Sequence, residues 1–372
     1  MTSQVALIHG DDRYDNLTAA LDAIADDVDL RGVDQILVKP NFVSPDYPLC
    51  ATHVDATRAT LDWLRARTDV PILIGDGSAI RNTWDAFENY GYLALPDQYR
   101  DVSLMDLNAD ETVELTAYDW RLRPMRLKAS RTAVESPFRI SVGPPKTHDT
   151  VLVTLSLKNM IMGGLVNRSS PPQGDPTGNG RQRNEPLVRL SRSRLTGAIK
   201  RVYEALPQRL RYNGPLEQAK MYCWSHFGPS SKRAMHQSFS VMNLNLFTLA
   251  HYLYPHLSLI DGFEAMEGNG PSKGGERVDW RIALASTDWL AADTTTARLM
   301  GFELDEVGYL TYCAQAGIGK TDPGAIEVAG NIRWAEVARR FKRHASSHLQ
   351  RRWESPAVNQ HIREALATGG QA

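Results

Sequence analysis

Short apolar runs alternate with amphipathic stretches along most of the chain, and the two patterns have different periods. Apolar residues at every position or every second position predict β-strands, and apolar residues three or four apart predict α-helices. Strands are expected at 4–10, 35–42, 70–78, 137–146, 256–266 and 280–287. Helices are expected at 15–28, 53–67, 82–92 and 287–302, with Asp15 or Asn16 capping the first. This alternation predicts an α/β fold with a mostly parallel or mixed sheet flanked by helices.

The domain organisation follows from the same pattern. Residues 1–333 are expected to form a single large α/β domain or two intertwined lobes, since the length suffices for either. The segment 167–185 is rich in glycine, proline and serine and predicts a mobile loop that closes over a site. Residues 334–372 predict a charged helical tail, which would pack on the domain or on a partner such as a second copy.

Charge and cysteine content exclude several classes of protein. Lys and Arg number 42 against 43 Asp and Glu, which gives no general case for a protein that binds nucleic acid or a membrane surface. Cys50, Cys223 and Cys313 lie far apart, which argues against a disulfide framework, a structural zinc site and an iron–sulfur cluster. The start of the chain lacks the pattern of a signal peptide, and no apolar run approaches the roughly 18–20 residues of a spanning helix. A cytoplasmic protein is expected.

Polar residues stand where the second and third predicted strands end. In an open α/β sheet, the carboxyl ends of the strands form the edge where ligands bind. Lys39 and Asn41 stand at the end of 35–42, and Asp76 and Ser78 at the end of 70–78. Each pair also fits a structural role, as a solvated lysine at a strand exit or a helix cap at Ser78. Two such pairs at one edge favour a ligand site.

The densest polar group follows the fourth predicted strand. The sequence GPPKTH brings Lys146 and His148 to its end, and the apolar stretch that follows carries Lys158 and Asn159. A lysine among apolar residues is costly unless it is paired. Lys158 is therefore a salt-bridge partner, a base with a shifted pKa or a ligand for an anion. Three donors within one short segment favour a functional role.

Acidic residues follow the fifth predicted strand. Asp261, Glu267 and Asn269 stand there, ahead of a glycine-rich turn. Oxygen ligands at a strand exit suit a divalent cation or a polar substrate. Asp293 lies in an apolar helical stretch, where it would cap a helix or pair with a core lysine such as Lys158.

These segments together are similar to one known family. VKPNF (38–42), GPPKTH (143–148), LSLKNMIMGG (155–164), DGFEAMEGNGP (261–271) and DWLAADTTTARLMGF (288–302) resemble the domain of unknown function 362 family, over roughly residues 5–330. The resemblance implies an α/β fold. It places in the shared pattern Lys39, Asn41, Lys146, His148, Lys158, Asn159, Asp261, Glu267, Asn269 and Asp293. Many relatives also carry a ferredoxin-like cysteine cluster, which this chain lacks, so no iron–sulfur cluster is expected.

The leading functional hypothesis is a small-molecule enzyme that acts on an anionic substrate bearing a phosphate, diphosphate or carboxylate. Its class is open among lyase, isomerase and transferase. The expected catalytic residues are His148, as general acid or base, with Lys146 and Lys158. The expected substrate-binding residues are Lys39, Asn41, Ser78, Asn159 and Asn269. Mg²⁺ or another divalent cation would be held by Asp76, Asp261 and Glu267.

Two alternatives stay open on the sequence. One is a metal-free racemase or isomerase in which Lys158 and His148 form a two-base pair beside a carboxylate. The other is a protein without catalytic activity, which either sequesters an anion or binds nucleic acid through the arginine-rich segment 181–211. Nucleic acid is the less favoured partner, because no aromatic residues are interleaved with those arginines in the way single-strand binding requires.

Overall fold

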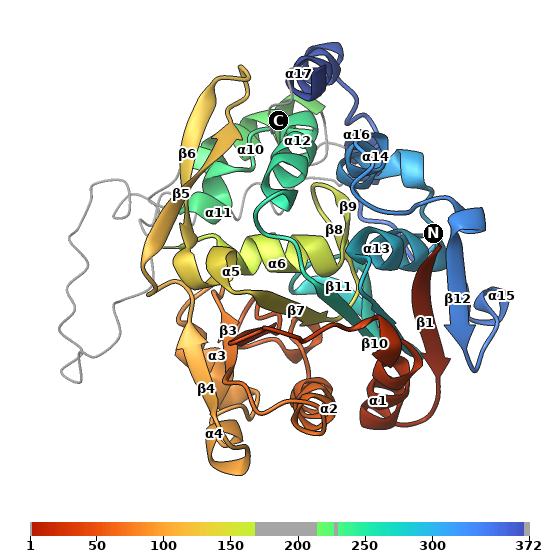
Figure 1. The fold of residues 1–372 in the computed structure, drawn as a ribbon. Helices are drawn as coiled ribbons and strands as arrows, with labels where there is room; N and C mark the ends of the chain where they lie inside the picture. Colours follow the sequence, from red (N-terminus) through yellow and green to blue (C-terminus); the bar gives the residue numbers. More distant parts are fainter. Residues whose placement is uncertain (1, 168–213, 227–229, 368–372) are drawn as a thin grey trace.

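The computed structural model describes residues 2–167, 214–226 and 230–367, and Figure 1 shows their arrangement. The predicted loop at 167–185, apart from its first residue, lies outside the described residues. The arginine-rich segment 181–211 lies outside them as well. The roles expected for both segments therefore stay predictions.

Ten strands of the described part form one mixed sheet, which confirms the predicted α/β class. Eight of them run across it in the order β12 (Ile326–Gly330), β1 (Ser3–His9), β11 (Gly274–Ser286), β10 (Leu257–Asn269), β7 (Phe138–Gly143), β2 (Ile36–Lys39), β3 (Ile72–Asp76) and β4 (Val102–Asp106). From β10 to β4 all neighbours are parallel. β11 is antiparallel to both β10 and β1, and β12 is parallel to β1. All six predicted strands are among these eight, and the two of the eight that were not predicted, β4 and β12, are the edges.

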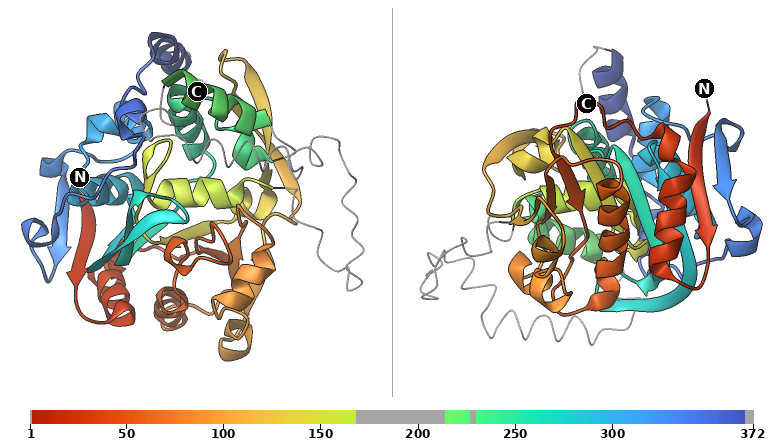
Figure 2. Two further views of the ribbon diagram at one scale, coloured as in Figure 1. Left: turned by 180° about the vertical axis from the view of Figure 1, so that it is seen from behind. Right: turned by 60° about the horizontal axis from the view of Figure 1, so that its bottom comes forward.

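Helices cover both faces of this sheet (Figure 1). One face carries α1 (Arg13–Ala23), α2 (Val54–Arg65) and α3 (Thr83–Asn89), and the right-hand view of Figure 2 brings the first two in front of the strands. The other face carries α6 (Ser156–Gly164), α12 (Phe239–Ala250), α13 (Trp289–Leu299) and α14 (Gly308–Gln315). Alternation along β2 supplies both cores, because Ile36 and Val38 pack under α1 to α3 while Leu37 joins the other cluster.

The remaining elements are short or lie at the periphery. They are α4 (Leu95–Gln98), α5 (Arg131–Glu135), α10 (Gly214–His226), α11 (Ser231–Ala234), η1 (Ala25–Asp27), η2 (Pro48–Cys50), η3 (Leu304–Glu306), η4 (Pro323–Ala325) and the separate hairpin of β5 (Thr112–Tyr118) and β6 (Pro124–Ser130). The first helix begins earlier than predicted. Its cap is Asp12, whose side chain accepts a hydrogen bond from the Asp15 N–H, and not Asp15 or Asn16.

β10 and β11 continue past the point where β7 ends. The last residue of β10 paired with β7 is Ile260, opposite Gly143, whereas the β10–β11 pairing reaches Asn269. This protruding arm, residues 261–280, bears a small hairpin of β8 (Lys146–His148) and β9 (Leu152–Thr154). One bridge, from Met266 to Lys146, joins the hairpin to β10. The arm thereby brings β8 and β9 to the carboxyl edge of the sheet.

The tail is helical only in part. Its helices are α15 (Trp334–Val337), α16 (Ser347–Gln350) and α17 (Pro356–Ala367), and residues 338–345 between the first two are not helical. Backbone N–H groups of this segment donate to carbonyls at the end of α13: the Arg339 N–H to Leu299 and the Phe341 N–H to Met300. Tertiary hydrogen bonds to the end of α13 outcompete local helix formation in this segment. The division at residue 333 stays a prediction.

Candidate active site

The carboxyl ends of β2, β3 and β7 meet at one edge of the sheet because these strands are parallel neighbours. They end at Lys39, Asp76 and Gly143. α6 packs across this edge from one face, and the β8–β9 hairpin lies beside it. The structure thus brings together five predicted site residues from separate segments: Lys39, Asn41, Asp76, Lys146 and Asn159.

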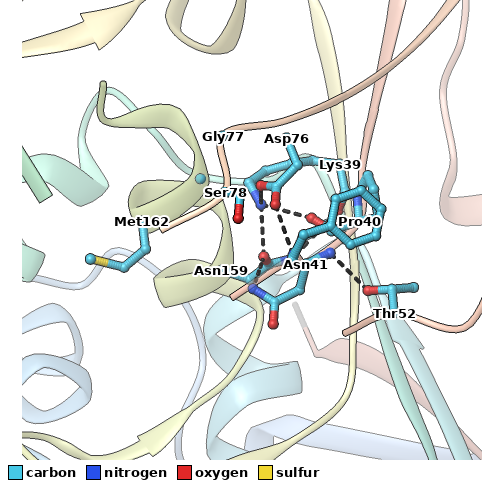
Figure 3. Close-up of polar contacts among 12 residues, drawn as sticks. Lys39, Pro40, Asn41, Thr52, Asp76, Gly77, Ser78, Asn159 and Met162 are labelled. Atoms are coloured by element: carbon cyan, nitrogen blue, oxygen red, sulfur yellow. Dashed lines mark hydrogen bonds and ion pairs between the residues drawn. The ribbon is translucent and has the colours of Figure 1, made fainter. Parts of the chain in front are cut away.

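Lys39 is the centre of this group and is fully buried. Its ammonium donates to Asp76 Oδ1 at 2.7 Å, Asn159 Oδ1 at 2.7 Å and the Pro40 carbonyl at 2.8 Å. Figure 3 shows these side chains pointing toward one another. An ammonium has three N–H donors, so Lys39 is saturated in this state. The other Asp76 oxygen accepts from the Phe42 N–H at 2.8 Å, so this carboxylate is occupied by the protein as well.

Asn159 and Asn41 extend the network toward Lys146. Asn159 Oδ1 accepts from Asn41 Nδ2 at 3.0 Å, and Asn159 Nδ2 donates to Ser141 Oγ at 2.9 Å. Asn41 Oδ1 in turn accepts from the Lys146 ammonium, which also donates to the Cys50 carbonyl at 3.3 Å. The third Lys146 N–H has no partner among the described residues. Lys146 is therefore the lysine of this group with a donor to offer.

α6 positions Lys158 and Asn159, and Asp293 holds its first turn. The Asp293 carboxylate accepts from the Ser156 N–H at 2.9 Å and from the Leu157 N–H at 3.0 Å. Asp293 thus caps this helix, which is one of the two roles expected for it, and the alternative pairing with Lys158 is wrong. Burial raises the pKa of Asp293 to about 7, and the two backbone donors oppose that rise.

Lys158 pairs with His148 instead. Their Nζ and Nε2 atoms lie 2.9 Å apart, and both side chains are buried. The Thr150 N–H donates to His148 Nδ1 at 2.9 Å. A neutral imidazole has one acceptor nitrogen, so Nε2 must carry the proton and donate it to Lys158. Asp149 Oδ1 lies 3.1 Å from Nδ1 and would stabilise an imidazolium, but the Thr150 N–H points at that nitrogen. This geometry requires Lys158 to be a free amine.

The electrostatics agree with this assignment. Burial lowers the pKa of Lys158 to about 7, and the charge of Lys146 lowers it further while Asp149 opposes the shift. Burial, followed by the charge of Lys158, lowers the pKa of His148 well below its usual value. Burial also lowers the pKa of Lys146 to about 8. At neutral pH the site therefore combines a protonated Lys146 with a Lys158 close to its titration point.

The other predicted site residues lie elsewhere. Asp261 is on the face covered by α1, where its Oδ1 accepts from Arg13 Nε at 3.1 Å. Glu267 and Asn269 are on the arm and hold the tail, since they accept from the Lys342 and Ala345 N–H groups, each at 3.0 Å. Ser78 donates to the Ile80 carbonyl at 2.8 Å within its own turn.

The three carboxylates predicted to hold a cation therefore do not come together. Asp76 contacts Lys39, Asp261 contacts Arg13, and Glu267 lies near Arg339. Among the described residues no three His, Cys, Asp or Glu side chains gather as a metal site would require. Strand alternation explains Asp261, because Ile260 faces α6 and the next residue faces α1. A bound divalent cation stays a prediction.

Sequence reasoning missed Lys232. It lies on α11, is buried, and donates to the carbonyls of Gly77 at 2.8 Å, Gly163 at 3.4 Å and Met162. Burial lowers its pKa to about 7, with the charge of Asp76 opposing. In the sequence it stands in a polar run, SSKRAMHQ, which resembles a solvated helix. No local pattern could have revealed that this lysine is buried close to the Lys39–Asp76 pair.

Gly163 makes the approach of α6 possible and yields a first prediction. A Cβ at this position would lie 2.0 Å from Lys39 Cε and 2.3 Å from Asp76 Oδ1. Gly163→Ala is therefore expected to destabilise the fold by about 1–3 kcal/mol, the cost of overpacking, despite alanine's better helix propensity. Urea unfolding measures the loss. Gly324→Ala is the control, because nothing lies closer than 3.6 Å there. Equal effects of the two substitutions would contradict the packing.

The fold and this edge define an α/β protein with a buried, lysine-rich polar network at the carboxyl ends of its parallel strands. The chain belongs to the family described as domain of unknown function (DUF362), whose model matches residues 36–298. The family resemblance expected from the sequence is thereby confirmed.

Two individual proteins are also similar to this chain. A thylakoid-associated protein of Synechocystis sp. is 23% identical over 300 residues, which cover 79% of this chain and 71% of that protein. The lactate racemase apoprotein from Thermoanaerobacterium thermosaccharolyticum gives a TM-score of 0.32 at 17% identity, over 43% of this chain and 39% of the racemase chain. That match spans well under half of either chain. In the described part, every helix is too short or too polar to cross a membrane. The cytoplasmic location stays a prediction.

Proposed function

We propose that this protein is a small-molecule enzyme that moves a proton on an anionic substrate. The observation that supports it best is the buried 2.9 Å contact between Lys158 Nζ and His148 Nε2, in which lysine is the free base. A lysine that only served the fold would be expected to pair with a carboxylate. An amine with a pKa near 7 is matched to general-base work at neutral pH.

In this proposal Lys158 takes a proton from the substrate and becomes an ammonium. The electrons of the broken bond stay on the substrate, where the positive charge of Lys146 stabilises them. Lys158 then returns the proton, either to the same atom or to a neighbouring one. His148 holds the amine in position through its Nε2–H until Lys158 takes the proton.

The hydrogen bond between them makes Lys158 and His148 one unit on one side of a substrate. A two-base racemase needs its bases on opposite faces of the reacting carbon, so this pair fits one-sided isomerisation or exchange better. The cation of the leading sequence hypothesis is no part of the proposal. Sequestering an anion without chemistry is the alternative that the next experiment separates from it.

Deuterium uptake with its pH dependence tests the proposal. Wild-type protein in D₂O, offered a panel of small hydroxy, oxo and amino acids and their phosphate analogues, is expected to exchange a substrate proton, followed by NMR. The value of kcat/KM should rise as Lys158 deprotonates through pH about 7 and fall as Lys146 loses its charge above about 8. The expected profile is a bell with its maximum between these two values.

The direction of each change in kcat/KM follows from the two lowered pKa values. Below pH about 7 Lys158 is protonated and cannot act as a base, and above pH about 8 Lys146 loses the charge that binds the anion. No exchange with any panel member would contradict proton transfer and favour a carrier. Activity that rises monotonically beyond pH 10 would show an unperturbed lysine and remove Lys158 from the mechanism.

A further inference from the structure

We infer that the substrate of this site is a small monocarboxylate, held by Lys146 and Thr154 in a crevice between the β8–β9 hairpin and α6. This inference rests on the proposed function and narrows its substrate class. The sequence left phosphate, diphosphate and carboxylate open. The decision among them comes from one unused hydroxyl and from the charges around the crevice.

The crevice is a narrow gap in the packing at the carboxyl edge of the sheet. Its polar lining includes Asn41, Lys146, Thr154, Ser156 and Asn159, and Figure 3 shows how the two asparagines approach each other at its border. Lys146 and Thr154 are direct partners in the antiparallel β8–β9 pairing, so their side chains lie on the same face of the hairpin. His148 is two residues from Lys146 on β8 and shares that face. A ligand on Lys146 would therefore lie beside the His148–Lys158 pair.

Thr154 supplies the observation that points to a ligand. The residue is only 5% exposed, and its Oγ1 is buried without a hydrogen-bond partner among the described residues. Burying a hydroxyl without a partner is unfavourable, so a ligand that supplied a partner here would gain from it. The Thr154 hydroxyl and the third Lys146 N–H are two donors on one face, which matches the two oxygens of a carboxylate.

The charges select a monoanion. The positive charge of Lys39 is balanced by Asp76, with which it forms a 2.7 Å ion pair. Above pH about 7 Lys158 is a free amine beside neutral His148, and Lys232 bonds to carbonyls near Asp106 and Asp76. Lys146 is then the one uncompensated cation that lines the crevice in the described structure. A phosphate monoester carries close to two negative charges at neutral pH, and a buried second charge without a partner is strongly disfavoured.

The crevice is too narrow in this state for a water molecule, so the ligand must widen it. The β8–β9 hairpin is held by its bridge to β10, by the Thr147 hydroxyl, which donates to the Gly268 carbonyl at 2.9 Å, and by the Leu152 N–H, which donates to Gln350 Oε1 at 2.6 Å. It also holds Leu152 at a φ of 65°, a left-handed conformation that costs a branched residue about 1–2 kcal/mol. Strain of this kind gathers at sites that rearrange.

Acetate and inorganic phosphate are the probes for this inference. Isothermal titration at equal ionic strength is expected to show acetate binding to wild-type protein more tightly than phosphate. Thr154→Val should weaken acetate binding about tenfold, the loss of one hydrogen bond, while raising the melting temperature of the ligand-free protein. The rise is expected because valine removes the buried, unpartnered hydroxyl at nearly constant volume.

Thr248→Val is the matched control. Thr248 Oγ1 is also buried and without a partner among the described residues, but it lies on α12 away from the crevice. This variant should melt higher as well, yet bind acetate as wild type does. Tighter phosphate binding, no acetate binding, or wild-type affinity in Thr154→Val would each overturn the inference. Acetate binding without deuterium exchange would contradict the proposed function but not this inference. Deuterium exchange on a phosphate substrate would contradict the carboxylate class but not the proposed function.

Discussion

Lys158→Met is expected to lower the rate of deuterium uptake by about 10²–10⁴-fold, the contribution of a positioned general base. Methionine keeps the length of the side chain and fits the apolar stretch of α6 around it, where Met160 and Ile161 are also buried. The fold should survive, because methionine removes a buried amine at the cost of leaving the His148 Nε2–H without its partner, about 1–3 kcal/mol. The measurement is the exchange rate at the pH optimum, alongside a urea unfolding curve.

The control for this prediction is Lys320→Met. Lys320 is exposed, and the hydrogen bond found for it comes from its backbone N–H, which donates to Asp288. Its replacement should leave the exchange rate unchanged. Wild-type exchange in a folded Lys158→Met variant would show that another group moves the proton. A loss of exchange together with a loss of folding would be resolved with His148→Gln, which keeps a polar, uncharged side chain but removes the imidazole that holds the amine.

Lys39→Met is expected to destabilise the protein by about 3–5 kcal/mol, because it leaves the Asp76 carboxylate buried without its cation. Asp76→Asn should cost a similar amount by stranding the ammonium. The double variant Lys39→Met/Asp76→Leu removes both charges and should recover most of the loss, since apolar replacements of buried ion pairs are often tolerated. Urea unfolding of the four proteins gives the comparison.

An exposed ion pair serves as the reference. Arg31 and Asp29 lie 2.6 Å apart, with 91% and 57% of their side chains exposed. Arg31→Ala is expected to leave the unfolding curve unchanged, because solvent screens this pair. If Lys39→Met is as mild as Arg31→Ala, the ion pair is not the anchor of the sheet edge. If the double variant is no better than the singles, packing and not charge explains their cost.

The candidate site was only partly predictable from the sequence. Lys39, Asp76 and Lys146 could be placed at one edge, because each follows an apolar strand and parallel strands share their carboxyl ends. The sequence could not tell which face each side chain takes. Asp261 follows an apolar run in the same way, but its side chain contacts Arg13 under α1. It lies on the face of the sheet opposite to that of its neighbour Ile260.

The sequence left the partners of two further acidic residues unsettled for a related reason. Asp293 stands in apolar surroundings, which fit a helix cap or a lysine partner, and Glu267 stands before a glycine-rich turn, which fits a cation ligand. In the structure each satisfies backbone N–H groups of a segment distant in the chain, the start of α6 and residue 342. Such hydrogen bonds depend on which distant segment packs against the side chain in the folded protein. The local sequence pattern does not contain that information.

The sequence by itself determined the α/β class, the six predicted strands and the residue types gathered near their ends, because periodicity and turn residues act over short distances. Only the tertiary structure decided which partners the lysines and acids take. In the described structure Lys39 pairs with Asp76, one N–H of Lys146 is left without a partner, and the Thr154 hydroxyl has none. Burial beside His148 lowers the pKa of Lys158, so that it can act as a base. Pairing and desolvation depend on what surrounds a side chain in space, and that follows from the packing of α6 and the β8–β9 hairpin against the sheet edge.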